Sequence, residues 1–118
     1  MSEPLELLKG TLDVLILKSL SWGPMHGYGV SRCIRLHTRD VLAVEDAALY
    51  QALHRLERNE WVESEWGLSD NNRRAKYYRL TRSGRAQLRS EATVWRRYAS
   101  AVAAVLDAAS REPSTAPA

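Results

Sequence analysis

The 118-residue sequence predicts a mainly α-helical fold with one small β-hairpin and a long C-terminal helix. Three observations lead to this prediction. Apolar residues recur every three or four positions in three segments before residue 59, which is the spacing of helices with one buried face. After residue 59 the pattern becomes that of extended strands around a polar turn. A seven-residue apolar repeat follows from residue 88.

The first predicted helix lies within residues 1–21, with Ser2 as its cap and Pro4 in its first turn. Gly23 and Pro24 mark its end, because both residue types interrupt helices. A second, shorter helix is predicted over residues 27–38. Its apolar positions follow the i, i+3, i+4, i+7 spacing and are Val30, Cys33, Ile34 and His37.

The third predicted helix lies within residues 44–58, with Asp46 as its N-cap. The stripe expected to face the core consists of Leu49, Ala52, Leu53 and Leu56. The opposite face and its flanks are small at first and rich in hydrogen-bond donors beyond, with Ala47, Tyr50, Gln51, His54, Arg55 and Arg58. Such a face suits a DNA major groove, where base edges are read by hydrogen bonds. An ordinary amphipathic surface helix has a similar pattern.

Two strands, residues 62–66 and 75–80, are predicted on either side of a turn at residues 67–74. Tyr78 and Leu80 share a face that can close on the helices. Three helices followed by a hairpin with a polar, basic tip form the winged helix-turn-helix arrangement, in which the hairpin is the wing. The predicted DNA-binding domain therefore covers residues 1–80.

Thr81 is the expected N-cap of a last helix that continues to about Ser110, too long for this small domain to cover. Its apolar stripe consists of Leu88, Ala92, Trp95, Tyr98, Ala99, Val102, Val105, Leu106 and Ala109. A second copy of the helix is the simplest partner for this stripe, so residues 81–110 are predicted to form a homodimer. The alternative is that the helix folds back on its own domain. Residues 111–118 are expected to be a disordered tail.

The net charge of +3 is unevenly distributed. Residues 1–69 contain seven Lys and Arg against ten Asp and Glu, whereas residues 70–118 contain ten against four. A localised basic region favours a polyanion as partner. A single cysteine allows no intrachain disulfide, and no signal peptide or membrane-spanning segment is visible, so a cytoplasmic protein is expected.

Catalytic residue types are present but form no catalytic motif. No pair among His26, His37 and His54 has metal-ligand spacing beside a carboxylate, and neither a phosphate-binding loop nor a nucleophile elbow occurs. Cys33 is interpreted as a small core residue. The sequence therefore predicts no catalytic residue, no metal, no cofactor and no enzymatic activity.

The chain resembles the PadR family of bacterial transcriptional regulators over nearly its whole length. Three stretches show the resemblance, and their order and spacing are highly specific: LKGTLDVLILKSLSWGPMHGYGV at residues 8–30, LYQALHRLERNEWVESEW at 49–66 and NNRRAKYYRLTRSGRAQL at 71–88. The resemblance implies a winged-helix DNA-binding domain with a dimerising C-terminal helix, usually in a repressor and sometimes relieved by a small molecule. The short C-terminal part resembles the compact branch with one long helix.

In the family, the third helix is the recognition helix. Ala48 stands where Ser often precedes the Leu-Tyr pair, and Gln51 stands where Pro often follows it. The first difference removes a phosphate donor, and the second supplies an amide that can make a bidentate contact to adenine. The resemblance therefore implies the docking mode but no operator sequence.

The expected partner is double-stranded DNA, bound as a pseudo-palindromic site with half-sites about one helical turn, or a multiple of it, apart. Gln51 and His54 are the candidates for base edges. The expected contacts to the backbone or the minor groove are Tyr50, Arg55 and Arg58 on the helix and Asn71, Asn72, Arg73, Arg74 and Lys76 on the wing.

Trp95 is also the candidate for binding a small planar aromatic effector, because two copies at the subunit junction would form an aromatic-walled pocket, as drug-binding relatives imply. The alternative is that Trp95 only anchors the dimer core. For the whole protein, the alternative is a winged-helix protein-interaction module that does not bind DNA.

Overall fold

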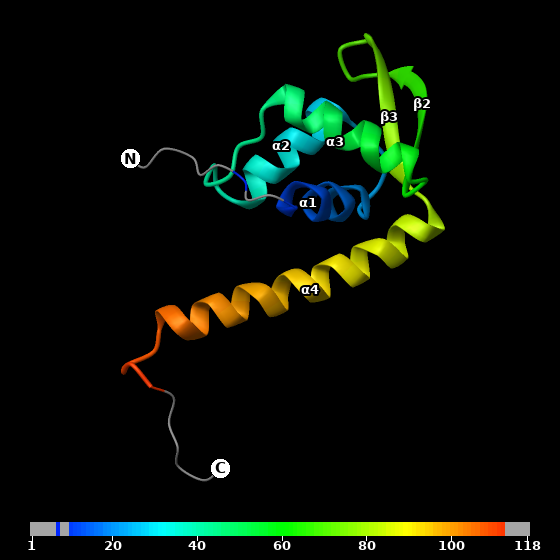
Figure 1. The fold of residues 1–118 in the computed structure, drawn as a ribbon. Coiled ribbons are helices and arrows are strands. Elements are labelled where there is room, and N and C mark those ends of the chain that lie inside the picture. The colour runs from blue at the N-terminus through cyan, green and yellow to red at the C-terminus, as the bar shows by residue number, and fades with distance from the viewer. Residues whose placement is uncertain (1–6, 8–9, 113–118) are drawn as a thin grey trace.

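The computed structural model describes residue 7 and residues 10–112. Within these residues the elements are α1 (Thr11–Leu20), β1 (Met25–His26), α2 (Gly27–His37), α3 (Asp46–Arg58), β2 (Val62–Leu68), β3 (Arg74–Leu80) and α4 (Arg82–Leu106). Figure 1 shows α1, α2 and α3 grouped together, the β2–β3 hairpin at one end of the group, and α4 running below α1. The predicted fold class, mainly α with a small hairpin in a winged-helix arrangement, is confirmed.

The core lies where the three short helices meet the base of the sheet. The buried stripe of α3 is the predicted one, and each of its side chains is at most 1% exposed: Leu49, Ala52, Leu53 and Leu56. The side chains packed with it are Ile16, Leu17 and Leu20 from α1, Val30 and Ile34 from α2, and Val62, Tyr78 and Leu80 from the sheet. Burying one such aliphatic side chain contributes about 1.5–3 kcal/mol. This packing fixes which face of α3 remains in solvent.

The sheet is antiparallel with the strand order β1-β3-β2. The predicted strands are longer than expected, because Leu68 pairs with Arg74 and Gly67 with Ala75. The turn is therefore residues 69–73 rather than 67–74, and the Ser69 amide donates to the Arg73 carbonyl at 2.8 Å. The short strand β1 was not predicted, since a strand of two residues shows no periodicity.

Three predicted helix boundaries are wrong. Glu45, not Asp46, occupies the N-cap of α3, and Asp46 lies in the first turn, where its charge favours the positive end of the helix dipole. The first helix begins at Thr11, because Gly10 before it has φ 87°, a left-handed conformation. The expected cap Ser2 lies outside the described residues, as does Pro4. The last helix ends at Leu106.

The second helix was predicted correctly, but its expected stripe is only partly buried. Val30 and Ile34 are in the core, whereas Cys33 is half-buried. His37 is exposed and stacks on Trp22 with 4.9 Å between ring centroids. The last turn of α2 therefore lies outside the core, which is consistent with the polar character of its C-terminal end.

The joint between the wing and α4 consists of a single residue, Thr81. Its backbone amide donates to the Trp61 carbonyl at 3.1 Å, and its hydroxyl donates to the Glu60 carbonyl at 2.7 Å. The same hydroxyl oxygen accepts from the Gly84 amide at 3.0 Å, so Thr81 is the N-cap, as predicted. Gly84 is buried, and a Cβ there would lie 1.9 Å from the Trp61 carbonyl oxygen. The first turn of α4 is thus fixed to the base of β2.

The first half of α4 packs along α1 (Figure 1). Leu88 packs against the core, and the indole N–H of Trp95 donates to the Thr11 hydroxyl at 3.2 Å. The fold-back that the sequence left open thus occurs along this half. From Tyr98 onward the large apolar side chains of the helix are exposed.

The buried hydroxyl of Tyr78 makes the stability of the fold depend on pH in the alkaline range. Its side chain is 2% exposed, and burial raises the pKa of its hydroxyl, with smaller contributions from Glu57 and Tyr50. Because the folded state favours the neutral phenol, this contribution to stability is complete below about pH 10 and is lost as the pH rises through the raised pKa.

We expect Tyr78→Phe, which keeps the ring in the core, to reduce the alkaline loss of unfolding free energy, measured by urea denaturation above about pH 9. Tyr28→Phe is the control, because Tyr28 is 70% exposed, and it should retain the parent profile. An unchanged alkaline profile in Tyr78→Phe would contradict this explanation.

An ion pair between Arg55 and Asp13 connects α3 with α1. The Asp13 side chain is 18% exposed and the Arg55 side chain 47%, so solvent screens the pair in part. In a double-mutant cycle of Arg55→Ala and Asp13→Ala, we expect a coupling energy of about 0.5–1 kcal/mol from urea denaturation. A cycle of Arg58→Ala with Asp13→Ala should show none. Additive effects in the first cycle would show that the pair does not stabilise the fold.

Candidate nucleic-acid interface

The face of α3 opposite to its buried stripe is open to solvent. Its first turn presents the small side chains of Ala47 and Ala48, and Gln51 and His54 follow along the helix. All four are exposed, as is Arg58 at the C-terminal end. The structure thus brings together the predicted base-edge candidates on one surface, with small residues in front of them.

Two further predicted contacts on α3 also have packing roles. Arg55 is ion-paired with Asp13, so its charge is partly neutralised within the domain. Tyr50 is 43% exposed, and its ring lies against Gly27 at the start of α2. A Cβ on Gly27 would lie 2.7 Å from the Tyr50 hydroxyl oxygen, so a side chain at position 27 would displace the Tyr50 ring. Because the Arg55 charge is paired with Asp13 within the domain, Arg58 is a better candidate for a phosphate contact than Arg55.

The turn of the wing is organised around Ser69. Its hydroxyl donates to Asn71 Oδ1 at 2.5 Å and contacts the backbone carbonyl of Arg73 at 3.0 Å. Asn72 has φ 62°, a left-handed conformation that asparagine tolerates. All predicted tip residues are exposed: Asn71, Asn72, Arg73 and Arg74. The tip therefore presents the Arg73 guanidinium on a hydrogen-bonded turn, and Arg74 follows at the start of β3.

Lys76 lies in a different environment from the tip. Its ammonium is 3.6 Å from a Glu57 carboxylate oxygen and 5.7 Å from the ring centroid of Tyr78. Ser64, on the neighbouring strand, donates to the other carboxylate oxygen of Glu57 at 2.6 Å. Lys76 and Ser64 thus hold the wing against the last turn of α3, which makes Lys76 a weaker candidate for a phosphate contact than the sequence suggested.

No motif in the sequence indicates a function for Trp66, the last residue of the first predicted strand. The Trp66 side chain is 58% exposed, and the Arg74 guanidinium lies 4.5 Å from its ring centroid. The sequence offered one indication of a role for Trp66. A large aromatic residue lies at the end of the strand that is farther from the core.

The predicted dimerisation residues on α4 divide into two groups. Leu88 is half-buried against its own domain, and Trp95 is 39% exposed with its N–H bonded to Thr11. The other four have exposed fractions between 42% and 77%: Tyr98, Val102, Val105 and Leu106. Ala109 lies beyond the end of the helix. The effector role of Trp95 stays a prediction.

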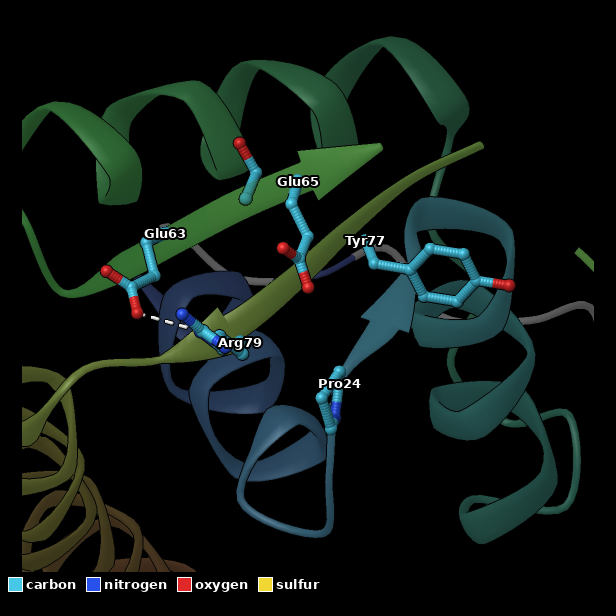
Figure 2. A pocket seen from close by; sticks show the side chains of 6 residues that line it. Pro24, Glu63, Glu65, Tyr77 and Arg79 are labelled. Carbon is cyan, nitrogen blue, oxygen red and sulfur yellow. Dashed lines mark hydrogen bonds and ion pairs between the residues drawn. The ribbon is translucent and has the colours of Figure 1, made fainter. Parts of the chain in front are cut away.

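A shallow pocket on the other face of the sheet has a different chemistry (Figure 2). Its lining residues are Pro24, Glu63, Ser64, Glu65, Tyr77 and Arg79. Because Ser64 is bonded to α3, strand alternation places Glu63 and Glu65 on the face away from that helix. Glu63 is paired with Arg79 at 2.7 Å. Two carboxylates make this face unsuitable for a polyanion.

Two observations concern other kinds of site. No three His, Cys, Asp or Glu side chains in the part of the chain that the structure describes are grouped as a metal site requires. None of the helices within residues 10–112 is long and apolar enough to cross a membrane. The polar surface on α3 and the wing is thus the main candidate site among the described residues.

Comparisons with known proteins identify the family. Residues 16–90 match the transcriptional regulator PadR-like family. A protein from Lysinibacillus sphaericus is 34% identical over 91 residues, which cover 76% of this chain and 83% of that protein. The structure of a transcriptional regulator from Clostridium thermocellum is similar with a TM-score of 0.72 and 30% identity over 80% of this chain and 88% of that one.

A PadR-like transcriptional regulator from Bacillus cereus has a TM-score of 0.72 and 27% identity, covering 86% of this chain and 96% of that one. Members of this family are transcriptional regulators, which confirms the prediction that the protein is not an enzyme. The resemblance noted in the sequence is likewise confirmed. The chain belongs to the PadR-like family of transcriptional regulators.

Proposed function

We propose that the protein is a cytoplasmic homodimeric repressor that binds a pseudo-palindromic DNA site. The main supporting observation is the two-sided character of α3. Its buried stripe is at most 1% exposed, while Gln51 and His54 on the other side are open to solvent behind two alanines. A helix fixed in this way can enter a major groove without rearrangement of the domain.

In the proposed complex, the N-terminal half of α3 lies in the major groove. Ala47 and Ala48 allow the backbone to approach closely, and the Gln51 amide donates to and accepts from an adenine edge. Arg58 and Arg73 contact phosphates on either side. In this arrangement the pocket with Glu63 and Glu65, on the other face of the sheet, points away from the DNA. The carboxylates are thus kept apart from the phosphates.

The second half of α4 supplies the proposed dimer contact. Its stripe of exposed apolar side chains continues the part of the helix that packs on α1, and an exposed patch of this kind marks an interaction surface. A second copy of the same helix has the same periodicity and covers the stripe symmetrically. Each head then reads one half-site, and occupation of a promoter excludes the polymerase.

A winged-helix protein-interaction module is the competing function. It shares the fold and the dimer helix but needs no contact with phosphates. The two functions differ in the dependence of binding on salt, because contacts with phosphates release counterions from DNA.

We expect a duplex selected from random sequences to be bound with a log-log salt slope near −5, for about six phosphate contacts. Gln51→Ala should weaken this duplex by about 5- to 150-fold, the equivalent of 1–3 kcal/mol, with little effect on unselected duplexes, measured by fluorescence anisotropy. Arg58→Ala is the matched control and should weaken both kinds of duplex and lower the slope by about one.

Equal weakening of all duplexes by Gln51→Ala would show that Gln51 does not read bases. A flat salt slope, or no binding of the parent to any duplex, would overturn the proposed DNA binding and favour the interaction module.

Val102→Lys places a charge at the centre of the apolar stripe of α4. We expect this variant to be monomeric in sedimentation velocity while the parent is dimeric, because a lysine without a partner resists burial. Ala104→Lys, on the opposite face of the same helix, is the control and should remain dimeric. A monomeric parent at micromolar concentration, or a dimeric Val102→Lys variant, would contradict the proposed contact.

A further inference from the structure

One face of the wing changes from core to solvent along its length. The residue pairs on this face, from base to tip, are Val62 with Leu80, Ser64 with Tyr78, Trp66 with Lys76, and Leu68 with Arg74. The exposed fraction is 1% at Val62 and 8% at Leu80, and it reaches 58% at Trp66 and 67% at Leu68. The face that closes the core at its base is therefore an open surface in its outer half.

The last turn of α3, the proposed recognition helix, contacts the middle of this same face. Glu57, in the last turn of α3, accepts a hydrogen bond from Ser64 and is ion-paired with Lys76. Beyond this contact the hairpin continues past α3, as Figure 1 shows. Trp66, which pairs with Lys76, and Arg74, which pairs with Leu68 nearer the tip, lie on the same hairpin face as this contact.

The three cations of β3 are held in different ways. Lys76 is paired with Glu57, and Arg79 on the other face is paired with Glu63. Arg74 instead lies over the Trp66 ring at 4.5 Å from its centroid. An ion pair neutralises a cation, whereas an aromatic ring holds it and leaves its charge available. A stacked guanidinium also keeps its N–H groups free at its edges.

We propose that Trp66 is a positioning residue for Arg74, holding the guanidinium ready to bond the DNA backbone beside the groove that α3 enters. This inference rests on the proposed DNA binding. The stack restricts the rotamers of a long side chain before binding, so less conformational entropy is lost when the contact forms. It also explains a large exposed tryptophan on the wing. The DNA-facing surface of the wing then includes its α3 side as well as its tip.

The test is a double-mutant cycle on the affinity for the selected duplex. Arg74→Ala should weaken binding and lower the salt slope by about one. Trp66→Leu should weaken binding about 2- to 5-fold in the parent, as expected for an exposed cation–π contact, and have no further effect in the Arg74→Ala background. Trp66→Tyr should restore most of the affinity, because it again offers a ring to the guanidinium.

Leu68→Ala is the control for loss of exposed apolar surface on the same face and should retain the parent affinity. Thermal melting of each variant checks that the fold is intact. Equal weakening by Trp66→Leu in both backgrounds, or the same loss in Trp66→Tyr as in Trp66→Leu, would overturn the inference while leaving DNA binding intact. Failure of the parent to bind any duplex would overturn both.

Discussion

The packing of one helical stripe determines the rest of this structure. Leu49, Ala52, Leu53 and Leu56 bury one side of α3 against α1, α2 and the base of the sheet. Since a helix has only one opposite side, this burial also selects the residues that face solvent, and the proposed recognition surface is a direct result of core packing.

Glu57 connects this packing with the wing. Its two carboxylate oxygens bind Ser64 from β2 and Lys76 from β3, so both strands of the hairpin are attached to the last turn of α3. The attachment lies midway along the hairpin, and it separates the half that closes the core from the half that extends into solvent. Glu57, an acidic residue within a basic surface, thus has a structural role. Its ion pair also partly neutralises Lys76.

Most of the fold could be predicted from the sequence, because periodicity reports burial directly: the stripe of α3, the hairpin face of Tyr78 and Leu80, and the cap at Thr81 were all identified. The helix starts were less predictable. Gly10 and Glu45 occupy the N-caps because of their backbone conformations, which the apolar periodicity does not report. The exposure of Gln51 and His54 was predictable in the same way. The ion pair of Arg55 and the stack of Trp66 on Arg74 were not, because they depend on contacts between elements.

The single-residue joint at Thr81 has a consequence for the targets of the proposed dimer. The wing and the long helix are connected without a flexible linker. The Thr81 amide donates to the Trp61 carbonyl and the Thr81 hydroxyl to the Glu60 carbonyl, and these two bonds fix the angle between the wing and the helix. Each added base pair rotates one half-site by about 34° around the DNA axis, given about 10.5 base pairs per turn. A rigid pair of heads cannot follow such a rotation, so insertions between half-sites would remove a promoter from control even with every contacted base unchanged.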